Sequence, residues 1–161
     1  MVREETLRDI TSFGGLPFYL ALGFMFLLTG KAVLAVQMAA ALVVGYAVTV
    51  FFRTVYFKKR PSEQNYTNFL YKLDASSFPS LHSLRGAMLW ALIALTFNVA
   101  ALYVMAAVII VAIAWTRVKQ KRHDPIDVSF GVIFGLLIAY GVFTLVSQQF
   151  IAVWLPFFLL S

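Results

Sequence analysis

The chain has 161 residues, of which 61% are hydrophobic and 12% are charged, with a formal net charge of +6 and a mean hydropathy of +0.85. Soluble domains of this size are far less apolar, so the composition predicts a polytopic membrane protein. The chain has no cysteine, which excludes thiol catalysis, disulfides and thiolate metal sites. Its two histidines also argue against a histidine-rich metal site.

Long apolar runs separated by short polar segments predict membrane-spanning helices rather than strands of a barrel, which would alternate apolar and polar residues. The first twelve residues are amphipathic and partly acidic, which predicts a helix on the membrane surface rather than a removable signal peptide. Spans are predicted at residues 16–28, 33–52 and 128–146, with Arg53 closing the second. We expect one all-α membrane domain over residues 1–161.

The apolar run at 84–115 decides how many spans there are. As one helix it would measure roughly 48 Å, against a hydrocarbon core of about 30 Å, so we expect two helices that break at Asn98. This makes a helical bundle of five transmembrane helices, or six if the apolar tail at 150–160 also crosses. With this count, the polar segments at 53–61, 79–85 and 116–127 all emerge on one face of the membrane.

These three segments read "RTVYFKKRP", "PSLH" and "TRVKQKRHDPID", and together they carry the residues that phosphoryl transfer needs. A phosphate is well held by the planar fork of arginine and by hydroxyl or backbone donors at a helix start. Arg53, Arg60 and Arg117 are the candidate clamps, and Ser80 and the amides around Leu81 are the candidate neutral donors.

Both histidines of the chain lie in these segments and can divide the chemistry. One imidazole can attack phosphorus, while the other protonates the departing oxygen and later deprotonates water. Asp127 follows His123 by four residues, so the two side chains can meet. However, Asp124-Pro125 is typical of a helix start, and Asp127 would then stabilise the first turn with or without any chemistry.

The segments resemble the signature of the type 2 phosphatidic acid phosphatase family, also called the lipid phosphate phosphatase or acid phosphatase/vanadium haloperoxidase superfamily. Its pattern is Lys-x6-Arg-Pro, Pro-Ser-Gly-His and Ser-Arg-x5-His-x3-Asp, and the spacings within each motif are intact here. Three positions differ, because Arg53 stands for lysine, Leu81 for glycine and Thr116 for serine.

The resemblance implies a role for each matching residue. His123 would be the nucleophile that forms a phosphohistidine, Asp127 its orienting partner and His82 the general acid. The phosphate would be held by the remaining residues of the signature, namely Arg53, Arg60, Ser80, Leu81 and Arg117. Since the family needs no metal, we expect no metal or other cofactor.

The expected partners are the bilayer and a membrane lipid phosphate, with no nucleic acid and no obligatory protein partner. The resemblance implies a phosphatase for phosphatidylglycerophosphate, undecaprenyl diphosphate, lipid A 1-phosphate or phosphatidic acid. Two alternatives are a catalytically inactive protein that binds lipid phosphates and a small transporter subunit. For a transporter, ionisable residues should lie within the spans.

The basic residues also bear on orientation. Twelve of the thirteen Lys and Arg residues, all except Lys31, lie in the N-terminal segment or on the site face, which by the positive-inside rule places that face in the cytoplasm. Relatives in the family usually act on the outer face of the cell membrane, and we favour that face here. Lys58 and Lys59 are interpreted as a juxtamembrane basic cluster.

Overall fold

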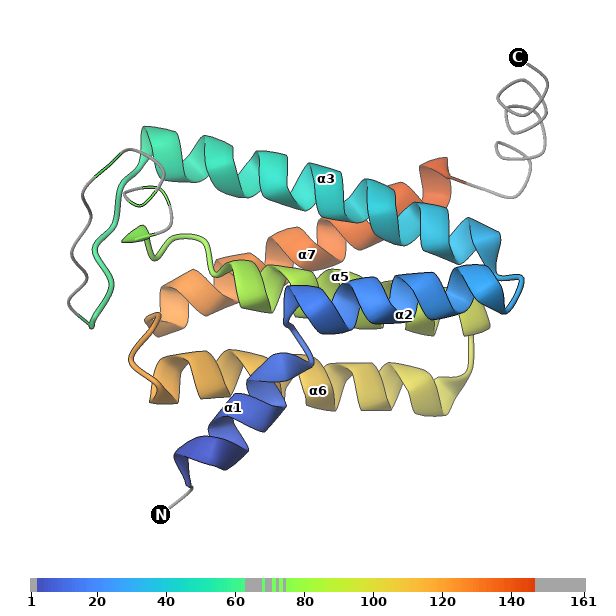
Figure 1. Cartoon of the computed structure of the whole chain (residues 1–161), viewed down its shortest axis with the longest axis horizontal. Helices are drawn as coiled ribbons and strands as arrows, with labels where there is room; N and C mark the ends of the chain where they lie inside the picture. Colours follow the sequence, from blue (N-terminus) through green and yellow to red (C-terminus); the bar gives the residue numbers. More distant parts are fainter. Residues whose placement is uncertain (1–2, 63–67, 69–70, 72, 74, 147–161) are drawn as a thin grey trace.

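The computed structural model describes residues 3–62, 68, 71, 73 and 75–146, and the regular structure in this part of the chain is helical (Figure 1). The prediction of an all-α membrane bundle is confirmed. The helices are α1 (Glu4–Ser12), α2 (Leu16–Leu28), α3 (Ala32–Val55), α5 (Leu81–Phe97), α6 (Ala100–Lys119) and α7 (Pro125–Leu145). The predicted sixth span at 150–160 lies outside the described residues.

Within the described residues, four stretches are long and apolar enough to cross a membrane, namely Glu4–Leu28, Ala32–Val55, Ala100–Lys119 and Pro125–Leu145. The first comprises α1 and α2, which are separated by a turn at residues 13–15. Helix α5 is apolar as well but shorter, with 17 residues. Five spans were expected, and the described residues provide four long apolar stretches and this shorter helix.

Local sequence accounts for where the helices begin and end. Asn98 closes α5 in the left-handed conformation, with φ of 49°, which asparagine tolerates better than most residues. The break predicted at this residue is therefore confirmed. The predicted ends at Phe52 and Trp115 are wrong, because α3 continues to Val55 and α6 to Lys119.

The extra turns of α3 and α6 carry arginines that a hydropathy pattern treats as stop signals. Arg53 and Arg117 are nevertheless buried in the structure, at 7% and 9% exposure. The Arg53 guanidinium donates to the Leu73 carbonyl, and that of Arg117 donates to the side chain of Gln120, the C-cap residue of α6. With these polar partners, the helices need not end where the apolar run does.

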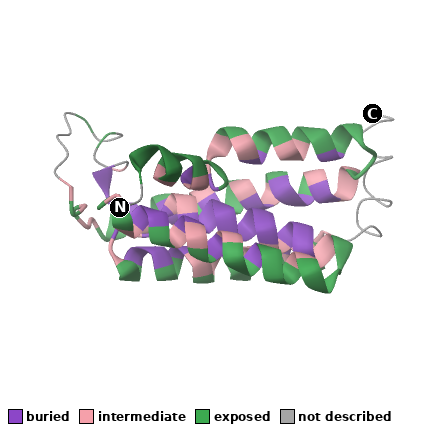
Figure 2. Cartoon of the chain, turned by 90° about the horizontal axis from the view of Figure 1, so that it is seen from below, coloured by how far each residue is buried: buried purple, intermediate pink, exposed green. Residues whose placement is uncertain are grey.

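Helix α5 forms the centre of the bundle. Eleven of its 17 residues are buried, and it packs against α7, α6 and α3. Figure 2 shows that the buried residues gather in the interior of the bundle. A helix that is apolar on all sides is suited to such a central position. The outer helices instead expose large apolar side chains, including Phe24, Val43, Val108 and Leu137, as expected where lipid replaces water.

Two glycines in α7 allow it to approach α5 closely. A Cβ atom at Gly131 would lie 2.6 Å from the Ser80 carbonyl oxygen, and one at Gly135 would lie 2.5 Å from that of Leu84. Small residues spaced four apart commonly form such close helix contacts in membranes. This packing fixes the beginning of α5 against the first turns of α7.

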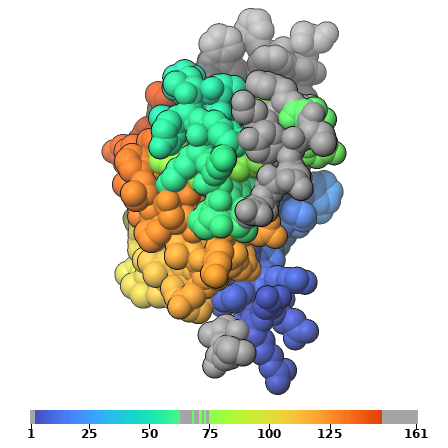
Figure 3. All heavy atoms as spheres, turned by 90° about the vertical axis from the view of Figure 1, so that its left-hand side faces the viewer, coloured from blue at the N-terminus to red at the C-terminus, as the bar shows by residue number. Residues whose placement is uncertain are grey.

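The end of α3, the beginning of α5, the end of α6 and the beginning of α7 all lie at one end of the bundle (Figure 1). The α2–α3 and α5–α6 turns lie at the other end. Figure 3 looks onto the first of these ends, where parts of α1, the segment after α3 and the beginning of α7 share one face. The fold therefore collects sequence-distant polar segments at one membrane interface.

Candidate active site

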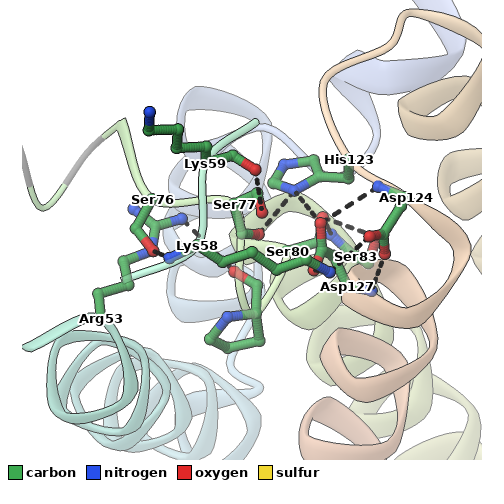
Figure 4. Close-up of polar contacts among 11 residues, drawn as sticks. Arg53, Lys58, Lys59, Ser76, Ser77, Ser80, Ser83, His123, Asp124 and Asp127 are labelled. Atoms are coloured by element: carbon green, nitrogen blue, oxygen red, sulfur yellow. Dashed lines mark hydrogen bonds and ion pairs between the residues drawn. The ribbon is translucent and has the colours of Figure 1, made fainter. Parts of the chain in front are cut away.

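The structure brings the three predicted segments together at this end of the bundle (Figure 4). The Ser77 amide donates to the Lys58 carbonyl at 2.8 Å, which joins the first segment to the chain just before the second. The Ser80 amide donates to the Asp127 carbonyl at 3.0 Å, which joins the second segment to the third. Backbone hydrogen bonds thus hold the three segments in one arrangement.

His123 is buried at 3% exposure, and the backbone holds its ring in place. Its Nδ1 atom lies 2.8 Å from the Ser77 carbonyl oxygen. A carbonyl can only accept, so this bond places a proton on Nδ1 and leaves the lone pair of the neutral ring on Nε2. The Asp127 Oδ2 atom is 3.8 Å from Nδ1, which makes it the second neighbour of the ring rather than its hydrogen-bond acceptor.

The beginning of α7 explains this geometry. The Asp127 amide donates to Asp124 Oδ1 at 3.0 Å, and the Asp124 amide donates to Asp127 Oδ2 at 3.1 Å, so the two residues form a capping box. The predicted helix start at Asp124-Pro125 is confirmed. His123 precedes this helix and therefore does not stand one helical turn from Asp127.

Lys58 links the first segment to the third through its side chain. Its Nζ donates to Asp127 Oδ1 at 2.7 Å and also to Asp124 Oδ2. Burial alone would lower the pKa of Lys58, but hydrogen bonds and charge attraction from the two carboxylates outweigh it and raise that pKa. The interpretation of Lys58 as part of a basic cluster facing lipid headgroups is therefore wrong, whereas Lys59 is exposed.

The surroundings of His123 favour its neutral form. Burial is the main cause that lowers the pKa of His123, and the nearby Arg117 and Arg60 guanidinium groups lower it further. The Asp127 carboxylate and the bond to the Ser77 carbonyl act in the opposite direction but do not reverse the shift. These surroundings therefore favour the neutral ring, in the tautomer that presents Nε2.

Arg53 and Ser80 have protein partners in the structure. Arg53 donates to the Leu73 carbonyl at 3.1 Å and to the Pro79 carbonyl at 3.5 Å. Ser80 is fully buried and is the N-cap of α5, where its Oγ lies 3.0 Å from Ser83 Oγ. Leu81 is the first residue of α5, and an amide at that position has no partner within its own helix.

His82 and Arg117 are the two predicted site residues that line a cavity of about 670 Å³. The other predicted site residues, including His123, are not part of its lining. Both histidines are within electrostatic range of Arg60 and Arg117. Arg117 donates to Gln120 Oε1 at 3.1 Å, while its buried Nε has no hydrogen-bond partner among the described residues. That Nε is therefore a donor available to a ligand.

The described residues hold no group of three or more His, Asp or Glu side chains placed to bind a metal ion. Their donors are guanidinium groups, hydroxyls and amides, which suit an anion. The site therefore combines the imidazole ring of His123, in a fixed orientation, with several cationic side chains that surround a cavity.

Three features of this site were not predicted. The Ser77 carbonyl and the Lys58 ammonium were missed because nothing local in the sequence points to a carbonyl or to one lysine of a pair. The contribution of α1 to the cavity was also missed. Lys58 could have been predicted from Asp127, because a carboxylate that becomes buried needs a positively charged partner.

The model of the PAP2 superfamily matches residues 34–151, which is most of the chain. The chain belongs to the PAP2 superfamily. The matched region includes all three polar segments of the site and leaves α1 and α2 outside it. No curated protein sequence matches the chain.

A solved structure agrees with the PAP2 fold. The crystal structure of the first transmembrane PAP2 type phosphatidylglycerolphosphate phosphatase from Bacillus subtilis matches with a TM-score of 0.70 and 24% sequence identity. The match covers 86% of this chain and 73% of the other. At this identity the likeness establishes a common membrane fold.

Proposed function

We propose that this PAP2 protein is a lipid phosphatase that works through a phosphohistidine on His123. Membership of the PAP2 superfamily and the membrane-embedded bundle support a phosphatase that acts on lipids. The observation that carries the mechanism is the Nδ1 bond from His123 to the Ser77 carbonyl, because it leaves Nε2 free to attack phosphorus. The ring lies within electrostatic range of Arg117 and His82.

The reaction would proceed in two steps. Nε2 of His123 attacks phosphorus, a P–N bond forms, and the bond from phosphorus to the leaving oxygen breaks. His82 protonates that oxygen as it leaves. In the second step His82 takes a proton from water, the water oxygen attacks phosphorus, and the P–N bond breaks to release inorganic phosphate.

The remaining residues would stabilise the charge on the phosphoryl group. Arg117 offers its Nε, and Arg60 lies within electrostatic range of both rings. The Leu81 amide is a neutral donor at the beginning of α5, a kind of group that stabilises developing charge without titrating. Arg53 and Ser80 would act mainly by holding the backbone around Pro79, since their polar atoms already contact protein groups.

We propose phosphatidylglycerophosphate as the first substrate to test, because the similar Bacillus subtilis protein is described as a phosphatidylglycerolphosphate phosphatase. Undecaprenyl diphosphate, lipid A 1-phosphate and phosphatidic acid complete the panel. A site at one end of the apolar helices suits all four, because the phosphate stays at the interface while the tail stays in lipid.

The decisive experiment measures inorganic phosphate released from this lipid panel in detergent, without added metal. His123→Ala should abolish release, and His82→Ala should reduce it by about 10²–10⁴-fold, the usual contribution of a general acid. Acid-labile, alkali-stable radioactive phosphate should label the parent protein and not His123→Ala. Equal rates for the parent and His123→Ala would contradict the mechanism and favour an inactive lipid-phosphate binder.

We further propose that the site faces the outside of the cell membrane. The cysteine-free chain suits a labelling test, because single cysteines can be introduced at each end of the bundle. Lys121→Cys marks the site end and Lys31→Cys the opposite end. A membrane-impermeant maleimide added to intact cells should label only Lys121→Cys, and labelling of only Lys31→Cys would place the site in the cytoplasm.

A further inference from the structure

The cavity beside His82 has a wall that the signature motifs do not supply. On one side it is lined by His82, by Arg117 and Lys119 at the end of α6, and by the three residues that follow α6. On the other side it is lined by one face of α1, at residues Glu4, Leu7, Arg8, Thr11 and Ser12. The match to the PAP2 superfamily begins at residue 34 and does not include this helix.

Helix α1 is attached to the same elements that carry the candidate catalytic residues. Thr11 Oγ1 lies 2.9 Å from Thr116 Oγ1 in a buried contact, next to Arg117 in sequence. In the turn after α1, a Cβ atom at Gly14 would lie 2.7 Å from the His82 carbonyl oxygen. The Gly14 carbonyl accepts from Arg85 Nε at 3.2 Å. Contacts to α5 and α6 thus fix α1 against the cavity.

The charges around the cavity exceed what one phosphate requires. Five cationic side chains line it, against a single carboxylate, that of Glu4. The cations are Arg8, Arg117, Lys119, Lys121 and Arg122. The volume of about 670 Å³ lies within the range of about 300–1,000 Å³ typical of sites for whole small molecules. A headgroup with more than one anionic group would match both the charge and the size.

Arg8 is the cation that α1 itself contributes. Its guanidinium lies 3.9 Å from the Glu4 carboxylate, and both side chains are mostly exposed. Such a surface pair contributes little, so Arg8 can exchange Glu4 for a substrate anion at small cost. We propose that α1 is the headgroup-recognition wall of the cavity, and that Arg8 binds a second phosphate group of the substrate. This inference rests on the proposed phosphatase function, in which His123 attacks the first phosphate.

The test compares two lipids with the same acyl chains in mixed micelles. Phosphatidylglycerophosphate carries a phosphodiester and a terminal phosphate, whereas phosphatidic acid carries one phosphate. Arg8→Gln should raise KM about tenfold for the first lipid, the effect of losing one charge-assisted contact, and less than about twofold for the second. Arg3→Gln is the matched control, because Arg3 stands at the N-cap position of the same helix and is not part of the cavity lining. This variant should leave both KM values unchanged.

Two outcomes would overturn the proposal. The first is that Arg8→Gln leaves the KM for both lipids unchanged. The second is that Arg8→Gln raises both KM values by the same factor while its melting temperature equals that of the parent. If the parent releases no phosphate from either lipid, the proposed function fails, and the role of α1 is then tested by lipid binding. The affinity for phosphatidylglycerophosphate in nanodiscs is compared between His123→Ala and the double variant His123→Ala with Arg8→Gln. The single variant should bind about tenfold more tightly, and equal affinities would refute the role of Arg8.

Discussion

Lys58 offers the sharpest test of the site because its ammonium joins two segments that are distant in sequence. Lys58→Met keeps the apolar stem and removes the charge that faces Asp124 and Asp127. The Asp127 side chain is fully buried, whereas that of Lys58 is 24% exposed. Breaking a fully buried ion pair costs about 3–5 kcal/mol and breaking an exposed one about 0.2–1 kcal/mol, so we expect an intermediate loss of about 2 kcal/mol.

For a chain of this size, such a loss corresponds to a fall in Tm of roughly 4–8 °C in detergent. The rate of phosphate release should also fall about tenfold or more, because Asp127 neighbours the His123 ring. Lys59→Met is the matched control, since that side chain is exposed and only its backbone carbonyl is used, as an acceptor for Ser77. If Lys58→Met behaved like Lys59→Met in both assays, the ion pair would not hold the site together.

The contribution of the Lys58 ion pair to stability depends on pH in one direction. The pKa of Lys58 is raised in the folded state above its ordinary value of about 10.4. The ion pair therefore contributes fully at all pH values below about 10.4 and is lost only as pH rises through the folded-state pKa. The difference in Tm between the parent and Lys58→Met should be constant from pH 7 to about 9, and a difference that vanished within that window would contradict the assignment.

The other predictions concern the proposed nucleophile His123, the contact of Gly131 in α7 with α5, and the buried side chain of Arg85. We expect a bell-shaped pH profile of kcat/KM, because the proposed mechanism needs His123 neutral and His82 protonated. Since the pKa of His123 is lowered, the acidic limb should have an apparent pKa below about 6.5, and a limb above that value would contradict a buried neutral His123. Gly131→Ala should destabilise the protein by about 1–3 kcal/mol, because its Cβ would lie 2.6 Å from the Ser80 carbonyl oxygen. Gly141→Ala is the control in thermal unfolding, because its Cβ would have no neighbour within 4 Å, and it should be neutral or slightly stabilising. Arg85→Met should lower Tm and raise proteolysis at the turn after α1, because the Gly14 carbonyl loses its donor; unchanged proteolysis would show that this bond does not hold the turn.

Local chemistry explains why much of the architecture was predictable. Asn98 interrupts an apolar run that is too long for one span, and Asp124-Pro125 contains both an N-cap and a favourable first helical residue. Span counting then placed the polar segments on one face, where the structure brings them together. Each of these inferences depends on residues close in sequence or on a length compared with the bilayer.

The features that were missed depend on tertiary contacts. A lysine in a basic run has the same local pattern whether it faces lipid headgroups or, like Lys58, a buried carboxylate. The acceptor for His123 is the backbone of Ser77, and any residue type at that position would supply it. The extra turn of α3 past Phe52 depends on carbonyls that receive the Arg53 guanidinium from another part of the chain.

Helices α5 and α7 begin side by side, joined by the hydrogen bond from the Ser80 amide to the Asp127 carbonyl. Their N-termini differ in how far nearby carboxylates compensate the helix charge. The partial positive charge at the beginning of a helix amounts to about half an elementary charge. In α7 the carboxylates of Asp124 and Asp127 neutralise it, whereas the first turn of α5 contains no acidic residue. Because the peptide dipoles that produce this charge do not titrate, the field at the beginning of α5 is available to an anion at any pH at which the protein is folded.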